Sequence, residues 1–428
     1  MKPSRMLLVQ LADIGDLIVT TPAIAALREA HPNAHLALLT SAHAAPVVQG
    51  TGLVDEVLVM DRGIFAGGMR ALLSPARLAE ALRMMWRLRR GRYDTVVFFR
   101  HFSTRAGALK HAAIALGAGS KRRVGLRNAH AFFLTESIAD EGFGACHEAQ
   151  HWLNVAALLG ADASPRPAVV AIDTDYQPDG IDADGGPLVI LHGGSGGLNR
   201  ARRWDVAHFA AVGDALHQRH NAKIVLVGGP HDDADAIAAA MRAPTLNLAG
   251  QTTLPQLAGL LQRADLFIGA DSGIMHLAAA AGVPMVTIFG PTNHAAWGPW
   301  TPGQDTPVLR SAPRCSPCGY VEHAVGLREG CAARTCMRMV TVESVLAAAE
   351  ARLTGQPYTP PAPVPLPPVA RIWPRVRILG LPVDGITYAQ WLDQIGAWIA
   401  AHRRQPGTQQ AAHICTTNPE FTMIAQRD

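Results

Sequence analysis

The sequence predicts an α/β protein with two Rossmann-like, doubly wound parallel sheets that face each other across a cleft. Short apolar runs alternate with segments of helical periodicity, which is typical of parallel sheets covered by helices. The alternation restarts near Gly186, and the 428 residues exceed the roughly 150 residues of an ordinary single domain. Ligands of open α/β sheets bind at the carboxyl ends of the strands, so we expect functional residues there.

Four parts are expected along the chain. An N-terminal Rossmann-like domain is predicted at 1–180 and a second at 181–355. The next stretch, 356–374, carries eight prolines and predicts a semi-rigid extended linker. The remaining residues, 375–428, indicate a strand, a turn and an amphipathic helix. They are too few for a whole domain, so we expect an incomplete third α/β unit.

Individual elements follow from the periodicity of apolar residues. In the first domain we expect strands at 6–11, 35–40, 55–60 and 94–99, and helices at 22–30 and 77–90. In the second we expect strands at 187–193, 222–229, 245–250, 265–270 and 283–290, and helices at 206–220, 254–264 and 274–282.

Charge and hydropathy limit the partners and the location. The formal charge is only +4, but basic residues gather in the first third of the chain: Arg83, Arg87, Arg89, Arg90, Arg92, Lys110, Lys121, Arg122, Arg123 and Arg127. This bias indicates either a face for anionic lipid or a phosphorylated acceptor, or an ordinary solvated face. No apolar run approaches the ~20 residues of a membrane span, and no signal peptide is visible. We expect a cytoplasmic protein, peripheral at the inner face of the cytoplasmic membrane, with no nucleic-acid partner.

Four of the six cysteines lie within 22 residues: Cys315, Cys318, Cys331 and Cys336. In a cytosolic protein such a cluster indicates a structural zinc site, or structural cysteines that are reduced or paired as disulfides. Cys146 and Cys415 are isolated and are expected to have no special role.

The segment 265–292 predicts a phosphate-binding β-α-β unit. A short strand ends at Asp271, Ser272 and Gly273, where a small-residue helix must begin. The first N–H groups of that helix have no intrahelical partner and lie at its positive end, so a diphosphate is expected to dock there. His276 is placed to reach a phosphate, or is packed as most helical histidines are. The alternative for Asp271 and Ser272 is that they only cap the helix.

A second candidate follows the first strand. Gly15 allows a tight turn and Asp16 lies at the mouth of the sheet, before a helix entered through Thr20, Thr21 and Pro22. A carboxylate there can accept a proton from an acceptor hydroxyl. The alternative is that Asp16 is the N-cap of the helix.

Two further loops follow strands of the second domain. One holds the glycines Gly193, Gly194, Gly196 and Gly197 and the arginines Arg200, Arg202 and Arg203. Guanidinium groups suit a diphosphate, although the loop is neither a Walker loop nor a dinucleotide fingerprint. The other places His231, Asp232 and Asp233 after two glycines, where one acid is expected to hold ribose hydroxyls.

Acid pairs with D-x-D spacing occur away from strand ends. They are Asp173 with Asp175 and Asp182 with Asp184, and we interpret both as linker polarity rather than as a catalytic metal site.

Together, the segment 11–24, the glycine loop, the segment 269–293 and the cysteine tail resemble the ADP-heptose:lipopolysaccharide heptosyltransferase family, glycosyltransferase family nine. The resemblance spans roughly residues 5–353. It implies a GT-B fold, an acceptor-binding N-terminal half, and a C-terminal half that binds the nucleotide-sugar. It also implies inverting transfer without a metal or another cofactor.

On this resemblance Asp16 is the catalytic base, with Gly15 and Thr20 on the acceptor side. The residues Asp271 to His276 fall on the donor diphosphate motif. Arg202 takes the position where many members have lysine in a K-x-W pattern. This departure keeps the charge but changes the geometry of phosphate binding.

The C-terminal part resembles the beginning of the WecG/TagA/CpsF family, which transfers N-acetylmannosamine-type sugars. Thr416 and Asn418 match an early T-x-N motif, but the segment that would carry the catalytic acid is missing. The resemblance implies a fusion of two enzymes of one cell-surface polysaccharide pathway.

The leading hypothesis is therefore an inverting, metal-independent glycosyltransferase. It would move a sugar such as heptose from a nucleotide-diphosphate donor, ADP-heptose or a related compound, to a lipopolysaccharide or lipid-linked acceptor. Two alternatives stay open: a nucleotide-sugar epimerase of the same architecture, and a non-catalytic scaffold that binds a nucleotide-sugar.

Overall fold

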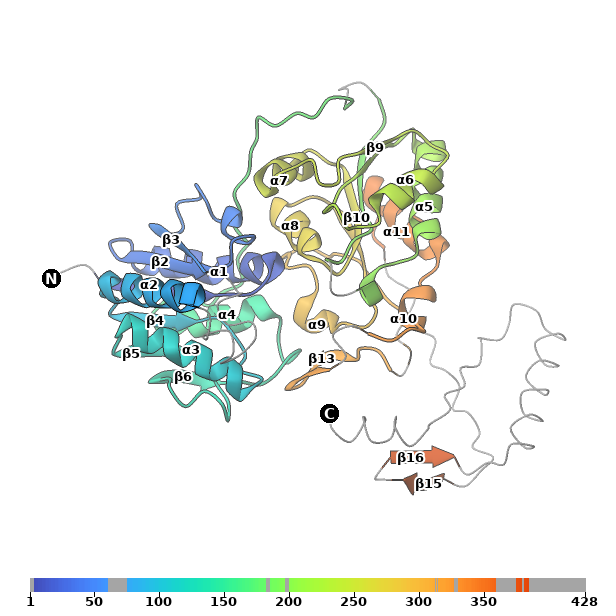
Figure 1. The fold of residues 1–428 in the computed structure, drawn as a ribbon. Coiled ribbons are helices and arrows are strands. Elements are labelled where there is room, and N and C mark those ends of the chain that lie inside the picture. The colour runs from blue at the N-terminus through green and yellow to red at the C-terminus, as the bar shows by residue number, and fades with distance from the viewer. Residues whose placement is uncertain are drawn as a thin grey trace. The chain divides into compact units, whose positions relative to one another are not determined.

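The computed structural model describes residues 4–60, 75–181, 185–196, 200–311, 313, 315–326, 330–358, 375–378 and 381–384. The chain forms two compact units, Met1–Pro363 and Val364–Asp428. The first unit contains two six-stranded parallel sheets with helices on their faces (Figure 1).

The first sheet has the strand order β3-β2-β1-β4-β5-β6. Its strands are β1 (Arg5–Gln10), β2 (His35–Thr40), β3 (Glu56–Val59), β4 (Thr95–Phe98), β5 (Arg122–Arg127) and β6 (Glu136–Ala139). The helices of this domain are α1 (Ile14–Ala30), α2 (Pro75–Gly91), α3 (Arg105–Ala118) and α4 (Glu148–Ala157), with the short 3₁₀ helix η1 (Ala45–Val47).

The second sheet has the order β12-β11-β10-β7-β8-β9. Its strands are β7 (Leu188–His192), β8 (Lys223–Leu226), β9 (Thr245–Asn247), β10 (Leu266–Ala270), β11 (Met285–Ile288) and β12 (Val308–Leu309). The helices are η4 (Arg200–Arg202), α5 (Val206–His220), α6 (Ala234–Ala240), α7 (Leu254–Gln262), α8 (Gly273–Ala281), α9 (His294–Trp297), α10 (Thr335–Arg338) and α11 (Val342–Leu353). A hairpin of β13 (Gly319–Val321) and β14 (Ala324–Gly326) follows the sheet.

Both strand orders are the 3-2-1-4-5-6 order of a Rossmann fold, which confirms the predicted fold class. Central strands such as β4 and β10 are buried along their whole length, as expected when helices cover both faces of a parallel sheet. One buried apolar cluster contains residues of both domains, including Leu17 of α1 and Met275 of α8. The two domains of the first unit therefore share part of their core.

Helix α1 begins eight residues earlier than the sequence analysis expected. A capping box forms its start, in which the Asp16 carboxylate accepts from the Asp13 backbone N–H at 3.0 Å. Pro22 lies inside the helix and cannot donate to the carbonyl of Ile18. The Thr21 hydroxyl donates to that carbonyl instead, at 2.7 Å, so the helix continues through the proline.

Two strands of the first sheet, β5 and β6, were not expected. In β5 the arginines at the ends suggested a basic cluster, whereas its central residues Val124, Gly125 and Leu126 are buried. The buried stretch is only three residues long and lies between exposed or half-exposed arginines, so the sequence lacks a clear apolar run. The two-residue strand β12 was missed for the same reason.

The second unit contains the antiparallel hairpin of β15 (Arg375–Ile378) and β16 (Leu381–Asp384). The proline-rich stretch 359–374 lies outside the described residues. So do Cys415, Thr416 and Asn418, and the WecG/TagA/CpsF resemblance therefore stays a prediction.

Within the part of the chain that the structure describes, no helix is both long enough and apolar enough to cross a membrane.

A hydrogen bond from Trp204 connects the loop before α5 to the loop before α11. Its indole N–H donates to the Val340 carbonyl at 2.9 Å, and both residues are buried. Replacing Trp204 by Phe keeps a ring but leaves that carbonyl unpaired, so we expect a loss of about 1–3 kcal/mol in the free energy of unfolding. The shift of the urea-unfolding midpoint, followed by far-UV circular dichroism, measures this loss. Trp86→Phe, at an exposed position, is the control and should change the midpoint little.

Candidate active site

Two helices begin where the sheets of the two domains face each other. Helix α1 follows β1 and helix α8 follows β10, and both strands border the point where the strand order of their sheet reverses. Figure 1 shows the two helices side by side, and their first turns are in contact. A Cβ atom at Gly273 would lie 3.4 Å from the backbone nitrogen of Gly15. Two positive helix ends therefore meet at one place, which favours an anion.

Asp16 stands in the first turn of α1, next to the contact between α1 and α8. Burial and the charge of Asp13 raise its pKa to about 6, although the hydrogen bond from the Asp13 backbone and the charge of Arg100 lower it. The negative charge of Glu148 adds to the rise. A carboxylate with this pKa is a stronger base than an ordinary aspartate and is still ionised at neutral pH. Asp13 is the N-cap of α1, so the alternative that Asp16 is the N-cap is wrong. Asp16 is the third residue of the helix, and its carboxylate is part of the capping box.

Thr20 is wholly buried and does not face the cleft. Its hydroxyl donates to the Asp16 carbonyl at 2.7 Å and accepts from the Gln10 side chain at 2.9 Å. Thr20 was expected on the acceptor side, but direct contact with an acceptor is excluded by its burial. Its bonds support the turn of α1 that presents Asp16.

Arg202 and Asp271 form an ion pair across the loops of the second domain. Their side chains approach to 3.2 Å, and Asp271 is 4% exposed. The Nε atom of Arg202 is buried without a hydrogen-bond partner among the described residues. The ion pair holds this guanidinium in place, and the Arg202 side chain is still 19% exposed.

Ser272, rather than Asp271, caps helix α8. The Ser272 hydroxyl accepts from the Met275 backbone N–H at 3.1 Å and lies 3.2 Å from Nδ1 of His192. The Nε2 atom of His192 lies 3.3 Å from the Asp232 carboxylate. This buried chain fixes the start of α8, so capping and preparation of a binding site go together.

The Asp232 carboxylate, which was expected to hold ribose hydroxyls, is bound by protein groups in this structure. Its carboxylate accepts from the Gly229 backbone N–H at 2.7 Å and pairs with Arg203 at 3.4 Å. Although burial raises the pKa of Asp232, the hydrogen bond and charge of His192 and the charge of Arg203 bring it below the ordinary value. A Cβ atom at Gly194 would lie 2.0 Å from this carboxyl group, so the glycine loop needs glycine there.

The rest of the glycine loop is held through Arg203. Its guanidinium binds Asp233 at 2.7 Å and also the carbonyl groups of Gly196 and His231. Gly193 packs against Ile237, where a Cβ atom would lie 2.4 Å from the side chain. Gly197 lies outside the described residues.

His276 is buried and neutral. Burial and the nearby charge of Arg202 lower its pKa to about 4. A Cβ atom at Gly15 would lie 2.7 Å from Cδ2 of His276, so the ring fills the space that Gly15 leaves. His276 thus acts as a spacer between the two domains, and its Nδ1 atom has no hydrogen-bond partner within the described part of the chain.

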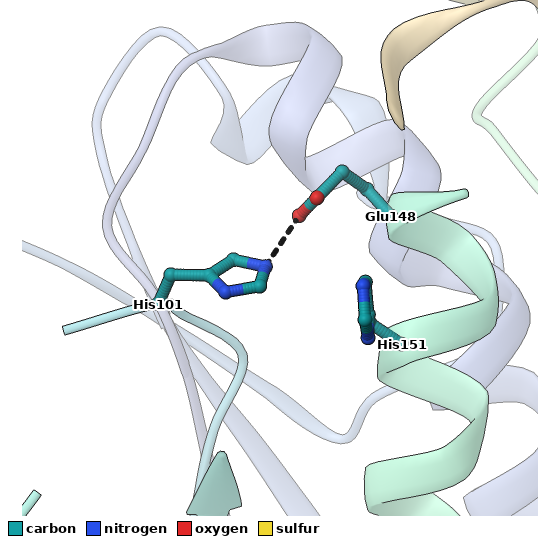
Figure 2. Close-up of side chains that lie close together, drawn as sticks. All are labelled: His101, Glu148 and His151. Atoms are coloured by element: carbon teal, nitrogen blue, oxygen red, sulfur yellow. Dashed lines mark hydrogen bonds and ion pairs between the residues drawn. The ribbon is translucent and has the colours of Figure 1, made fainter. Parts of the chain in front are cut away.

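The sequence analysis missed a buried group in the first domain. His101 follows β4, and Glu148 and His151 lie on α4; Figure 2 shows the three side chains directed toward one another. Although burial lowers the pKa of His101, hydrogen bonds to Asp140 and Glu148 raise it to about 9. The Glu-x-x-His spacing of residues 148–151 was the available signal, because it places both side chains on one helix face.

The four clustered cysteines are free thiols, which excludes the disulfide alternative in this structure. Burial, and then the neighbouring cysteines, raise the pKa of Cys336 to about 11, and the same causes raise the pKa of Cys318. The thiols are therefore near one another.

The acid pairs with D-x-D spacing do not meet at a strand end among the described residues. Asp173 and Asp175 form a turn in which the Asp175 backbone N–H donates to the Asp173 carboxylate. Asp182 and Asp184 lie outside the described residues.

With this geometry in place, comparison with known proteins decides the family. A family model described as glycosyltransferase family 9 (heptosyltransferase) matches residues 81–324, more than half of the chain. The chain belongs to glycosyltransferase family 9.

Individual relatives of this family 9 chain differ in how much they cover. Lipopolysaccharide heptosyltransferase 3 of Escherichia coli is 44% identical over 103 residues, 23% of this chain and 30% of that protein. Lipopolysaccharide heptosyltransferase 1 of Pseudomonas aeruginosa is 27% identical over 328 residues, 73% of this chain and 86% of that protein. The matched part thus spans about 30% of the length of the first relative.

The structure of the E. coli heptosyltransferase WaaC with ADP has a TM-score of 0.61 to this family 9 chain. The two are 19% identical, and the match covers 81% of this chain and 99% of that one. At this identity the likeness shows the fold.

Because His276 occupies the space above Gly15, a methyl group at Gly15 should push the two helix ends apart. We expect Gly15→Ala to lower the turnover of this family 9 chain roughly 10- to 100-fold. His276→Ala added to Gly15→Ala should recover much of the loss, because it removes the clash. Steady-state rates of the two single variants and the double variant measure the coupling. Independent effects of the two substitutions would contradict the proposed contact.

Proposed function

We propose that this protein is an inverting glycosyltransferase that moves heptose from a nucleotide-diphosphate donor to a lipopolysaccharide or lipid-linked acceptor. One observation carries the proposal: Asp16 of the first domain and the Arg202–Asp271 pair of the second lie at the ends of elements that meet at Gly15 and His276. The family assignment supports the substrate class, as does the similarity to lipopolysaccharide heptosyltransferases of E. coli and P. aeruginosa.

The transfer step follows from these positions. Asp16 takes the proton of an acceptor hydroxyl as its oxygen attacks the anomeric carbon. The bond from that carbon to the diphosphate oxygen breaks in the same displacement, which inverts the configuration. The diphosphate leaves with the bonding electrons, and Arg202 and the first N–H groups of α8 bind its added charge.

No metal enters this step, because Arg202 and the helix ends supply the positive charge that a leaving diphosphate needs. The donor base is proposed to be adenine, since the solved family structure that matches this fold contains ADP. Arg202 in place of the common lysine gives two parallel donors toward one phosphate, where an ammonium gives a point charge.

Removal of the Asp16 carboxylate tests the proposal. With ADP-heptose and a heptose-deficient lipopolysaccharide acceptor, Asp16→Asn should lower kcat by about 10²- to 10⁴-fold. A base works when deprotonated, so the wild-type rate should rise with pH through about 6 and level off above it. Asp13→Asn keeps a capping residue but removes the charge that raises the Asp16 pKa, so it should shift this rise to lower pH while leaving the rate at pH 8 close to wild type.

Three results would overturn the proposal. Near-wild-type turnover of Asp16→Asn would remove the base assignment. Turnover of the donor without acceptor to an epimeric sugar would establish the epimerase alternative. Donor binding without turnover against any acceptor would establish the scaffold alternative.

We also propose that the outer surface of α2 and α3 rests on the anionic inner face of the cytoplasmic membrane, where lipid-linked acceptors lie. Leu78, Leu82 and Trp86 repeat every four residues on α2 and are exposed by 44%, 61% and 59%. The exposed Arg83 and Arg87 alternate with them. Leu109 and Leu116 add apolar surface on the neighbouring α3. Apolar side chains flanked by arginines are typical of surfaces that bind anionic lipid.

Vesicle binding tests this surface. We expect the full chain to sediment with vesicles that contain phosphatidylglycerol, and less so at high salt. Leu82→Ser combined with Trp86→Ser should reduce the bound fraction several-fold because apolar area is lost. Met339→Ser, which removes an exposed side chain of the second domain, is the matched control. Equal binding of all three proteins would contradict the assignment of this surface.

For the cysteine cluster, we propose a structural zinc ion held by Cys315, Cys318, Cys331 and Cys336. The support is their spacing in the sequence, with a C-x-x-C pair at 315–318 and all four cysteines within 22 residues. Four thiolates would give a closed tetrahedral site without catalytic chemistry.

A further inference from the structure

We propose that His101, Glu148 and His151 form a second metal site, which binds a divalent transition-metal ion inside the first domain. One ligand atom from each residue is available, and these three atoms lie within 4.8 Å of one another. Donors that share an ion through bonds of about 2.0–2.2 Å lie at most about 4.4 Å apart, so the group is close to that spacing, and His101 Nε2 and Glu148 Oε2 are already 3.1 Å apart. In Figure 2 the His101 ring and the Glu148 carboxylate point into the space beside His151.

Two elements of different origin supply the ligands. Glu148 and His151 stand one turn apart on α4, so their side chains lie on the same helix face. His101 follows β4, next to the point where the strand order of the first sheet reverses. The arrangement is set by the packing of the domain and needs no movement of the backbone.

Neighbouring groups orient both imidazoles. The Asp140 carboxylate lies 2.8 Å from Nδ1 of His101, which directs Nε2 toward Glu148 at 3.1 Å. The Gly142 carbonyl lies 3.3 Å from Nε2 of His151, which leaves Nδ1 for an ion. Histidine ligands of metal sites commonly donate their second ring N–H to a carboxylate or carbonyl group in this way.

The burial of Glu148 points to a missing partner. Glu148 is 0% exposed, and its Oε1 atom has no hydrogen-bond partner among the described residues. The Asp140 side chain is also nearly unexposed, at 2%. A buried carboxylate needs a partner for each oxygen. A proton on His101 neutralises one of the two acids, whereas a divalent ion neutralises both.

The donor set selects the class of ion. Two imidazole nitrogens and one carboxylate oxygen suit Zn²⁺ or Fe²⁺, while Mg²⁺ and Ca²⁺ prefer oxygen ligands alone. The ion would connect β4, α4 and, through Asp140, the end of β6. The Asp140 carboxylate also accepts from the Gly142 backbone N–H, and the next residue, Phe143, pairs with Glu322 beside the β13 hairpin of the second domain. The ion would therefore stabilise the loop 140–143 of the first domain, which contacts the second domain through Phe143 and Glu322.

Metal content and affinity of the full chain test the proposal. The protein would be stripped with a chelator and titrated with Zn²⁺ in a Cys315→Ser, Cys318→Ser background, so that the cysteine cluster does not contribute. We expect one equivalent of Zn²⁺ to bind and to raise the melting temperature. Co²⁺ in its place should show no thiolate bands in its absorption spectrum.

Variants of the ligands locate the ion. In the same background, His151→Ala should remove the bound equivalent and the rise in melting temperature. Glu148→Gln, which keeps the side-chain volume, should do the same if His151→Ala fails to fold. Asp140→Asn should weaken binding about 10- to 100-fold. His111→Ala is the matched control, because His111 is also buried in this domain but lies outside the group.

Absence of a bound equivalent in the Cys315→Ser, Cys318→Ser background would overturn the proposal. An unchanged Zn²⁺ affinity in the His151→Ala and Glu148→Gln variants would overturn it as well. Because these readouts are metal content and stability, they do not depend on the proposed transfer reaction.

Discussion

The close approach of the first turns of α1 and α8 is the constraint on which the rest of the structure depends. Gly15 and Gly273 have no side chains, and the His276 ring fills the gap between them. This contact brings Asp16 of one Rossmann domain, the proposed base, to the start of α8 in the other, the proposed site of the donor diphosphate. It also places two positive helix ends together. The backbone dipoles alone therefore favour an anion at this place, without any charged side chain.

Ion pairs fix the positions of two arginine side chains in the loops of the second domain. Asp271 holds Arg202, and Asp232 and Asp233 hold Arg203, so the arginines have fixed positions without a ligand. Groups held in place in this way stabilise a leaving group without reorganisation during the reaction. Burial of Asp16 itself raises its pKa in the first domain.

The fold was predictable because its signals are local. The apolar strands of both sheets and the helices at 206–220 and 254–264 follow from the period of a few neighbouring residues. The misses have local causes as well. The early start of α1 was missed because Pro22 suggested that the helix begins there, whereas the Thr21 hydroxyl allows the helix to continue through the proline. Strand β5 was missed because it carries arginines at both ends.

The sequence by itself determined the two Rossmann folds, the loops that carry the polar residues, and the residues Asp16, Arg202 and Asp271 as candidates. Only the tertiary structure decided which polar groups are already bound by protein partners. In the folded protein Thr20 is buried, and Asp232 is bound by Arg203 and His192. His276 is buried and neutral between the two domains. It also assembled His101 with Glu148 and His151, which stand 47 and 50 positions away in the chain. The reason is physical: a hydrogen bond or a burial cost depends on neighbours in space, and sequence periodicity reports only neighbours along the chain.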